Sequence, residues 1–501
     1  MQVARKEWVL HPYPTDHPNW VLDIVRFGES LGEKCFALLE GKEDEHQRTY
    51  LAFGEGWTLT RKNFEQDNRS RQSEHTESPD PLHHLRGFLQ THHPNHDLES
   101  GLIGYLDFEW GLKWQKPSSS LATPDYFFRL SPINLVLLPL SQRVVLEVLS
   151  EEKERLEQTF KLWSHALDRF LMRDIPNSSI VSTPTTPTTP TTSTTSTTSA
   201  TFATPATSAT SATSAIAPTP QKSAPSWYSN ISKEGFLKRV EQIKEYIRAG
   251  DIFQAVPSQC FKKDVQLNPW TFYQKLRILN PSPYLFCVFG ERETLVGSSP
   301  ELLISSVGSH LQTRPIAGTR PRGKTLEEDL THEKELLQDP KEMAEHAMLV
   351  DLGRNDLGRV SKYGSVKVNQ YAGIQRFSHV MHIVSTVEGH LDPAYDSLEA
   401  LKAVFPAGTL SGAPKVRALE ILQELESEPR GAYGGALGIV RWNGDLDFCI
   451  TIRTLSIKEH QVRVQTGAGI VFDSLPEREF EETVHKAQAL LKVVDECVSG
   501  P

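Results

Sequence analysis

Cysteine is scarce in this chain. Its 501 residues include five cysteines, and no two of them form a CxxC pair: Cys35, Cys260, Cys287, Cys449 and Cys497. Without such pairs the sequence gives no indication of a zinc site, and this usage is typical of proteins in a reducing compartment. We therefore expect a cytoplasmic location.

Long apolar runs and basic clusters are also missing. No apolar segment is long enough to cross a bilayer. The N-terminal sequence MQVARKEWVLHPYPTDHP has neither the apolar core of a signal peptide nor the Arg- and Ser-rich composition of a transit peptide. The formal net charge is −10, and no basic patch alternates with aromatic residues. We therefore expect a globular protein that binds neither membranes nor nucleic acids.

Thr, Ser, Ala and Pro are abundant in one place, between about Ser182 and Ala224. This segment has too little apolar surface to offset the entropy lost on ordering, so we predict that 182–224 is disordered. A glycosylated, mucin-like stalk would require secretion, which the N-terminus does not indicate. The segment separates an N-terminal region, 1–175, from a C-terminal region, 226–498.

Apolar patterning predicts strands and helices on both sides of this segment. Strand-length apolar or alternating runs occupy 34–40, 101–108, 133–138, 142–149 and 252–259. Helical periodicity extends over 151–172 and 233–249. The alternation of strands and helices predicts an α/β or α+β fold for the C-terminal region.

One stretch near the C-terminus, Gln465–Leu491, is typical of a strand, a glycine turn and a helix. Pro476 is expected in the first helical turn, where a missing N–H is harmless. Four apolar side chains follow at helical spacing and are expected to face a core: Phe480, Val484, Ala487 and Leu491. Glu479 and Glu482 lie one turn apart on another side. Alone, this pair is more typical of carboxylates that complement the helix dipole than of a cation site.

A second pair of glutamates changes that interpretation. Residues 339–352 are expected to form a helix that begins near Pro340 and presents Glu342 and Glu345 one turn apart. Mg²⁺ typically takes one or two protein carboxylates together with water and an oxyanion of the substrate. Two such helices near glycine-rich loops therefore indicate a magnesium site. The next segment, Asp351–Val360, is interpreted as a turn network held by internal salt bridges.

Two glycine-rich loops accompany these helices. Pro315–Gly323 (PIAGTRPRG) combines glycines, which permit close backbone approach to a ligand, with the hydroxyl of Thr319. Phe405–Lys415 (FPAGTLSGAPK) precedes an expected helix over 416–424, and hydroxyl and N–H groups at a helix N-terminus suit an anion. Neither loop has the GxxxxGK[ST] or strand-bound GxGxxG pattern, so we predict no nucleotide site.

Predicted strands supply further candidates. Arg453 lies in DFCITIRTL, where a guanidinium could bind a carboxylate through two hydrogen bonds; the alternative is a buried ion pair. His379 and His382 are three residues apart, so on a regular strand they face opposite sides. At most one of these histidines can therefore point into a site.

Several long motifs occur in this chain: GDIFQAVPS, SSPELL, PIAGTRPRG, DLGRNDLGRV, FPAGTLSGAPK, GAYGGALG and GAGIVFDSLPEREFEET. Through them the region 226–495 resembles the large subunit (component I) of anthranilate synthase, one of the chorismate-utilising enzymes. FALLEG and GYLDFEW extend a looser resemblance into the N-terminal region. The resemblance implies an α+β fold, a sandwich of antiparallel sheets surrounded by helices. It also implies conversion of chorismate and ammonia to anthranilate and pyruvate.

The same resemblance implies residue roles. Glu301 would be the general acid for the departing hydroxyl, a role that needs a raised pKa. His382 would handle protons or stabilise the transition state, and Lys486 would pair with the carboxylates. The ligands of Mg²⁺ would be Glu345 and Glu482, supported by Glu342 and Glu479. The substrate would be bordered by Gly318, Thr319, Thr409, Tyr433, Arg453, Gly467, Ala468 and Gly469.

Two positions bear on the choice between sister reactions. Relatives that form isochorismate or salicylate have a lysine base where this chain has Gln254, and an amide cannot deprotonate water. Many aminodeoxychorismate synthases have a nucleophilic lysine where this chain has Ala317. Both differences favour direct attack by ammonia. Aminodeoxychorismate synthase stays as the alternative, because some of those enzymes also lack the lysine. A silent ligand-binding subunit is disfavoured, because the metal carboxylates, Glu301 and Arg453 are present.

The resemblance also implies partners. The chain shows no cysteine in a glutaminase-like elbow, so ammonia would come from a separate glutamine amidotransferase subunit, in a heterotetramer of two large and two small subunits. Tryptophan would bind as a feedback inhibitor in the N-terminal region and at a second motif: Glu40, Gly41, Pro281, Ser282, Pro283 and Tyr284. Gly41 replaces a serine of the family, and the missing hydroxyl predicts weakened inhibition.

Overall fold

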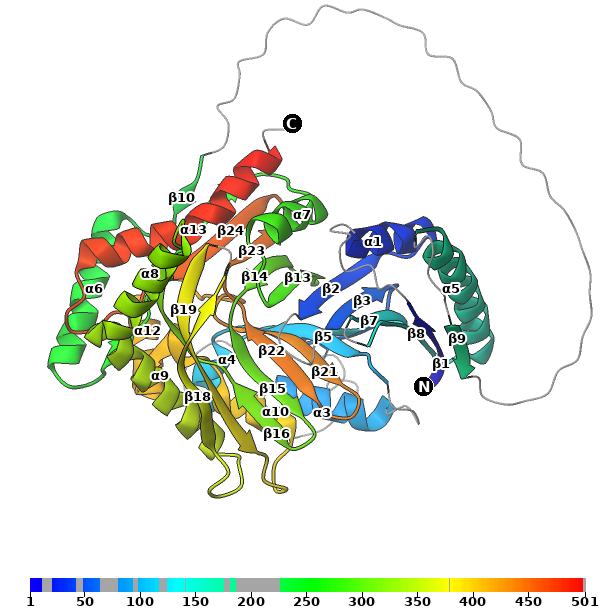
Figure 1. The fold of residues 1–501 in the computed structure, drawn as a ribbon, viewed down its shortest axis with the longest axis horizontal. Helices are drawn as coiled ribbons and strands as arrows, with labels where there is room; N and C mark the ends of the chain where they lie inside the picture. Colours follow the sequence, from blue (N-terminus) through cyan, green and yellow to red (C-terminus); the bar gives the residue numbers. More distant parts are fainter. Residues whose placement is uncertain are drawn as a thin grey trace, which may run out of the picture.

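Two large antiparallel sheets face one another and are covered by helices (Figure 1). The structure is a computed structural model, and it describes residues 1–10, 20–41, 48–63, 80–92, 98–116, 124–139, 141–174, 181–185, 226–377 and 379–498. These residues confirm the α+β class expected from the sequence. No helix among them combines the length and apolar character that a membrane span requires.

The larger sheet has twelve strands among the described residues. Their order across the sheet is β10 (Tyr228–Ser229), β12 (Ser258–Asp264), β24 (Gln461–Gly467), β23 (Thr454–Lys458), β14 (Thr294–Ser299), β13 (Tyr284–Phe289), β2 (Cys35–Gly41), β3 (Arg48–Phe53), β7 (Ile133–Leu138), β8 (Arg143–Ser150), β1 (Gln2–Val9) and β9 (Val181–Thr185).

The smaller sheet has ten strands in the same part of the chain. Their order is β17 (Ile316–Pro321), β19 (Val380–His390), β16 (His310–Thr313), β15 (Leu302–Val307), β22 (Leu446–Ile450), β21 (Ala436–Arg441), β5 (Gly101–Leu106), β6 (Tyr126–Leu130) and β4 (Trp57–Thr60), with β18 (Lys367–Arg376) also paired to β19. A separate two-stranded ladder joins β11 (Gln254–Ala255) to β20 (Gly412–Ala413).

Strands from the two regions of the sequence share both sheets. In the larger sheet β2 pairs with β13, which places Leu39 opposite Phe286. In the smaller sheet β5 pairs with β21, which places Ile103 opposite Ile439. All four side chains belong to one apolar cluster with members from both sheets. Burying a side chain of this size contributes roughly 1.5–3 kcal/mol, so this layer joins the two regions of the sequence.

Helices cover the outer faces. Those whose apolar residues share a cluster with the larger sheet are α1 (Trp20–Ser30), α5 (Lys153–Asp174), α7 (Pro269–Leu279) and α13 (Pro476–Val498). Those that share a cluster with the smaller sheet are α3 (Pro81–His92), α4 (Trp110–Gln115), α9 (Pro340–Gly358), α10 (Ser397–Val404), α11 (Gly408–Ser411) and α12 (Lys415–Leu425). Among the described helices, the other two are α6 (Lys233–Arg248), which packs on α13, and α8 (Leu326–Gln338), which packs on β17.

Helix α9 is longer than the sequence predicts. It continues to Gly358, so the turn network expected at Asp351–Val360 is wrong for most of that segment. Each glycine in a helix costs about 1 kcal/mol relative to alanine, but Val350 and Leu357 are buried and stabilise the extension. An ion pair expected within this segment is present, at 3.0 Å between Arg354 and Asp351, and Asp356 pairs at 2.7 Å with Lys415 outside it.

Other boundaries also differ from the expectations. The strand predicted at 252–259 is split around Pro257, which cannot donate to a ladder, into β11 and β12. β9 takes in Ser182 to Thr185 of the segment predicted to be disordered, and its Val and Thr residues favour strands. The rest of that segment, 186–224, lies outside the described residues.

Helix α13 begins at Pro476 as predicted. At several points, however, the residue that it buries is one position away from the apolar residue expected to face the core. Ala487 is fully buried as expected, and Leu490 is buried in place of Leu491.

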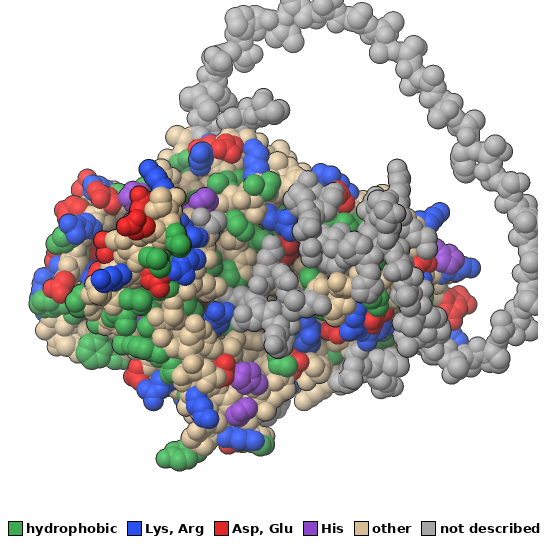
Figure 2. Space-filling view, viewed as in Figure 1, with side chains coloured by type: hydrophobic (Ala, Val, Ile, Leu, Met, Phe, Trp, Pro, Cys, Tyr) green, Lys and Arg blue, Asp and Glu red, His purple; other side chains and the backbone are tan. Residues whose placement is uncertain are grey.

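On the surface, Figure 2 shows basic and acidic side chains interspersed over the described part of one face.

Candidate active site

A cavity of about 740 Å³ lies among β17, β19, α9, α13 and the loops beside them. All the residues predicted for catalysis, substrate binding and metal binding line it, except Ala468. Ala468 is fully buried in an apolar cluster with Phe236 and Ile470. Segments that are far apart in the sequence therefore meet at one site, and the alanine of the GAG turn faces the core behind it.

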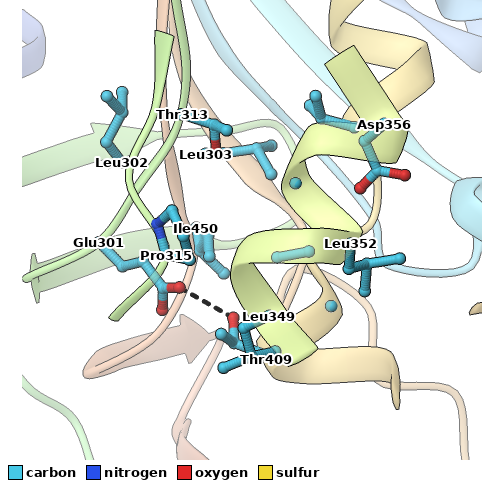
Figure 3. Close-up of a pocket in the computed structure, with 14 residues that line it drawn as sticks. Glu301, Leu302, Leu303, Thr313, Pro315, Leu349, Leu352, Asp356, Thr409 and Ile450 are labelled. Carbon is cyan, nitrogen blue, oxygen red and sulfur yellow. Dashed lines mark hydrogen bonds between the residues drawn. The ribbon is translucent and has the colours of Figure 1, made fainter. Parts of the chain in front are cut away.

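Glu301 occupies the inner end of the cavity. It follows β14, is only 6% exposed, and accepts a hydrogen bond of 2.9 Å from the hydroxyl of Thr409. Figure 3 shows the two side chains pointing toward one another, with Leu349 of α9 beside them. Burial raises the pKa of Glu301 from 4.5 to about 8, although the Thr409 hydrogen bond lowers it. The carboxyl is therefore protonated at neutral pH and can donate a proton.

His382 projects from β19 toward Gly318 and Thr319 of the paired strand β17, so the segment PIAGTRPRG, predicted as a glycine-rich loop, is mainly a strand. Its Nδ1 lies 2.8 Å from the carbonyl oxygen of Gly318 and 3.2 Å from the hydroxyl of Thr319. A carbonyl oxygen can only accept, so Nδ1 carries the hydrogen and a neutral ring leaves Nε2 as an acceptor. Burial lowers the pKa of His382, which favours this neutral form. His379 instead contacts the carbonyl of Leu279, outside the cavity, as the strand spacing predicts.

The backbone conformation and the close packing at Gly318 both require glycine. Its φ is +63°, a conformation that glycine adopts without strain. A Cβ atom at this position would lie 2.9 Å from Leu336 Cδ1 and 3.1 Å from Glu342 Oε2. Strand β17 can therefore approach helices α8 and α9 this closely only with glycine here.

The carboxylates of α9 and α13 face the same cavity. Burial raises the pKa of Glu345, with Glu342 and Glu482 adding to the shift. Burial likewise raises the pKa of Glu479, to which Glu482 contributes. These carboxylates are close enough to repel one another, and a bound cation would offset that repulsion.

Several of these carboxylates have protein partners. Glu482 forms an ion pair of 2.6 Å with Lys486, and Glu342 forms one of 3.3 Å with Arg320. Glu345 accepts a hydrogen bond of 2.8 Å from Gln254, whose own Oε1 is buried without a hydrogen-bond partner in the described part of the chain.

The carboxylates of α9 and α13 are oxygen donors of the kind that Mg²⁺ prefers. Within the described ranges, no three His, Cys, Asp or Glu side chains are grouped closely enough to hold a metal. Mg²⁺ usually takes only one or two protein carboxylates and completes its octahedron with water and substrate oxygens. Glu345 and Glu482, from the two helices, are the pair predicted for this role, and both line the cavity.

Arg453 and the GAG turn line the cavity beside these carboxylates, and a Cβ at Gly469 would lie 3.3 Å from Glu345 Oε1. Arg453 adopts φ +50°, a strained value for a residue other than glycine. No carboxylate of the described residues lies within ion-pair distance of it, so the predicted alternative of a buried ion pair is wrong. Its Nη1 donates a 3.4 Å hydrogen bond to the carbonyl of Lys486. Although burial lowers the pKa of Arg453, the guanidinium is a cation available to a ligand carboxylate.

The GAG turn depends on its two glycines. A Cβ at Gly467 would lie 2.8 Å from the Pro257 carbonyl and 3.1 Å from the Tyr433 hydroxyl, and one at Gly469 would lie 2.6 Å from Gln254 Nε2. Lys486 donates a 3.0 Å hydrogen bond to the carbonyl of Gly467. Bare backbone therefore borders the cavity between Tyr433 and Gln254.

Comparison with known proteins identifies the family. The profile of a family described as chorismate binding enzyme matches residues 34–492. The chain belongs to the chorismate-binding enzymes. This family assignment confirms the resemblance expected from the sequence.

Individual relatives of this chorismate-binding enzyme are similar mainly over half its length. Anthranilate synthase component 1 of Acetivibrio thermocellus is 55% identical over 269 residues, 54% of each chain. The protein of that name from Aquifex aeolicus (strain VF5) is 53% identical over 270 residues, 54% of this chain and 55% of its own. The matches thus span about half the length of these curated relatives. The crystal structure of anthranilate synthase component I from Streptococcus pneumoniae TIGR4 is 30% identical, with a TM-score of 0.65, and covers 91% of this chain and 92% of its own.

The residues predicted to bind tryptophan lie together at a second place in this chorismate-binding enzyme. Gly41 at the end of β2 is opposite Tyr284 at the start of β13, and Pro281, Ser282 and Pro283 lead into that strand. Glu40 is 2% exposed and accepts hydrogen bonds from Tyr273 and from Arg277, the latter at 2.9 Å. Residues 42–47 lie outside the described part, and tryptophan binding stays a prediction.

Sequence reasoning missed three basic residues at the cavity: Lys341, Arg478 and His485. Lys341 directly precedes Glu342, and Arg478 directly precedes Glu479. A basic residue before each ExxE pair was visible in the sequence. Because adjacent helical residues differ in direction by about 100°, that spacing alone did not indicate a shared cavity.

Proposed function

We propose that this chain is the chorismate-converting component of an anthranilate synthase. Ammonia adds at C2 of chorismate as the C4 hydroxyl leaves, and pyruvate is then eliminated, so chorismate and ammonia give anthranilate, pyruvate and water. The observation that carries the proposal is the placement of a buried, protonated Glu301 in one cavity with Arg453 and the carboxylates of two helices. The identity of more than 50% to proteins named anthranilate synthase component 1 supports it.

The chain's own residues account for the proton transfers. Glu301 gives its proton to the departing hydroxyl, which leaves as water. His382, with its hydrogen on Nδ1, accepts a proton at Nε2. Arg453 and the GAG turn bind the carboxylate of the enolpyruvyl group, assisted by Tyr433. Mg²⁺ bound by Glu345 and Glu482 would supply positive charge for the ring carboxylate.

Ammonia is the proposed nucleophile because the cavity lacks a lysine at the two positions that direct sister reactions. Gln254 and Ala317 both line the cavity. The amide of Gln254 cannot deprotonate water, and the methyl group of Ala317 cannot form a covalent adduct. These two side chains favour anthranilate over isochorismate and over aminodeoxychorismate.

Partners and regulation belong to the same proposal. A glutamine amidotransferase subunit supplies the ammonia, in an assembly of two large and two small subunits. Tryptophan acts as a weak feedback inhibitor at Glu40, Gly41 and the segment 281–284. The adjacency of β2 and β13 supports a shared binding site for these residues.

The deciding experiment incubates the purified chain with chorismate, MgCl₂ and ammonium chloride and records anthranilate fluorescence. We expect product with ammonium and none when glutamine replaces it. Accumulation of aminodeoxychorismate without anthranilate would overturn the proposal in favour of the sister enzyme. Absence of any chorismate consumption by the folded chain would overturn it in favour of a silent subunit.

A further inference from the structure

Arg430 is a buried arginine outside the cavity described above. It lies in the loop between α12 and β21, and its side chain is 1% exposed. The guanidinium donates four hydrogen bonds: two to the carboxylate of Glu426, at 2.7 and 2.9 Å, one of 2.8 Å to the carbonyl of Leu410, and one of 2.6 Å to the carbonyl of Val256. All three nitrogens are thus used in a fixed planar arrangement.

The groups that Arg430 binds belong to the wall of the cavity. Val256, Leu410 and Tyr433 all line it, whereas Arg430 does not. The ring of Tyr433 lies 5.9 Å from the guanidinium carbon, and that of Phe108, which does not line the cavity, lies 4.3 Å from it. One guanidinium therefore connects three segments of the wall that are far apart in the sequence.

Each of these segments carries a group proposed to act on the substrate. Leu410 directly follows Thr409, the hydrogen-bond donor to Glu301 (Figure 3). Val256 follows Gln254 by two residues. The hydroxyl of Tyr433 lies over Gly467, where a Cβ would approach it to 3.1 Å. A shift of the guanidinium would therefore move the general acid's partner, the amide and the anion-binding turn relative to one another.

Glu426 extends the same network. Besides Arg430, its Oε1 accepts hydrogen bonds from the backbone N–H of Ser258, at 2.8 Å, and from the Ser258 hydroxyl, at 2.9 Å. Ser258 begins β12, the strand paired with the GAG-turn strand β24, where it is opposite Gly467. The Glu426–Arg430 pair thus also fixes the strand on which the turn rests.

We propose that Arg430 is a positioning residue for the amination of chorismate. It holds Thr409, Gln254 and Tyr433 in their relative positions without touching the substrate. The inference rests on the proposed function. A displacement of about 1 Å in reacting groups can lower turnover about 10²-fold. Lysine at this position would keep the charge but could not reproduce four hydrogen bonds in one plane.

The test compares Arg430→Lys with a matched control, Arg441→Lys. Arg441 is 6% exposed and pairs with Asp445 four residues later, as Arg430 pairs with Glu426 four residues earlier, but it does not contact the cavity wall. Anthranilate formation from chorismate, MgCl₂ and ammonium is measured together with the thermal unfolding midpoint. We expect kcat of Arg430→Lys to fall about 10- to 100-fold with KM for chorismate within about threefold, and Arg441→Lys to keep its kcat.

The inference is overturned if folded Arg430→Lys turns over within about twofold of wild type, or if Arg441→Lys loses as much kcat. Should Arg430→Lys fail to fold, Glu426→Gln takes its place, because the amide NH₂ breaks the two-bond pairing while keeping the shape; full kcat there overturns the inference. A wild-type chain that makes no anthranilate would instead refute the proposed function.

Discussion

The two ends of the cavity use the same residue type in different surroundings. At the inner end Glu301 is 6% exposed, has a hydroxyl as its partner, and has a pKa raised by burial to about 8. On the outer wall the side chain of Glu482 is 47% exposed and lies 2.6 Å from the ammonium group of Lys486. Burial without an ion-pair partner suits a proton donor, and an exposed, ionised carboxylate suits a ligand of metal ions. The surroundings, more than the residue type, separate the two roles.

Of the substitutions that test this contrast, Glu301→Gln should have the largest effect on turnover. Glutamine keeps the size of the side chain and can accept the Thr409 hydrogen bond, but it cannot protonate the leaving hydroxyl. We expect kcat to fall about 10²- to 10⁴-fold, measured by anthranilate fluorescence. Glu147→Gln is the control, because Glu147 is also fully buried but lies outside the cavity lining. Equal kcat values for the two variants would show that Glu301 is not the acid.

Glu482→Gln tests the outer wall. Removing one proposed ligand should weaken Mg²⁺ binding at least about tenfold, seen both in the Mg²⁺ dependence of turnover and directly by titration calorimetry. The helix should stay folded, since the side chain is half exposed. Glu477→Gln, in the exposed first turn of α13 and outside the cavity lining, should leave Mg²⁺ binding unchanged. Unaltered Mg²⁺ binding by Glu482→Gln would exclude this residue as a ligand.

The pH dependence of turnover should reflect the titration of Glu301, at the inner end of the cavity. Because the pKa of Glu301 is raised to about 8, the protonated acid is present below that pH and is lost above it. At a fixed concentration of free ammonia, kcat should fall about tenfold per pH unit above about 8. The residual activity of Glu301→Gln should lack this decline, and a decline of equal steepness in that variant would assign it to another group.

Stability should change with pH for the same reason. The unfolded carboxyl ionises near 4.5 and the folded one near 8, so the folded state holds an extra proton between these values. The stabilisation is therefore complete below about pH 4.5 and is lost as pH rises to about 8. Glu301→Gln should show a flatter decrease in the free energy of unfolding over this range, measured by urea denaturation.

Gly41→Ser should have the smallest effect, at the separate site shared by β2 and β13. A Cβ at Gly41 would lie 3.7 Å from the Arg48 carbonyl and 3.9 Å from Asp447 Oδ2, so a serine fits without displacement. A regained hydroxyl should lower the tryptophan inhibition constant by roughly three- to tenfold, the effect of one hydrogen bond. Gly41→Ala controls for the added carbon, and identical inhibition of both variants would refute a role for the hydroxyl.

The elements of the site with local determinants could be predicted from the sequence. The i, i+3 spacing in helices α9 and α13 fixed which side carries Glu342 and Glu345 or Glu479 and Glu482. The glycines of the GAG turn were also identifiable, because backbone that approaches a ligand excludes a Cβ. The family resemblance supplied the roles of Glu301 and His382, which no local pattern indicates.

Features that depend on packing could not be predicted. Helix α9 continues past Gly353 because the adjoining sheet buries Val350 and Leu357. Arg430 attracted no attention in the sequence, since its four acceptors come from three separate segments that meet only in the folded chain. The pKa of Glu301 likewise depends on burial by neighbours that are distant in the sequence.

The sharing of both sheets by both regions of the sequence has a consequence for synthesis on the ribosome. β2 and β5 emerge early, but their partners β13 and β21 are translated much later. Until then one edge of each early strand is unpaired, and such edges are prone to associate with other chains. The pairing of β2 with β13 and of β5 with β21 can therefore form only after β21 has left the exit tunnel.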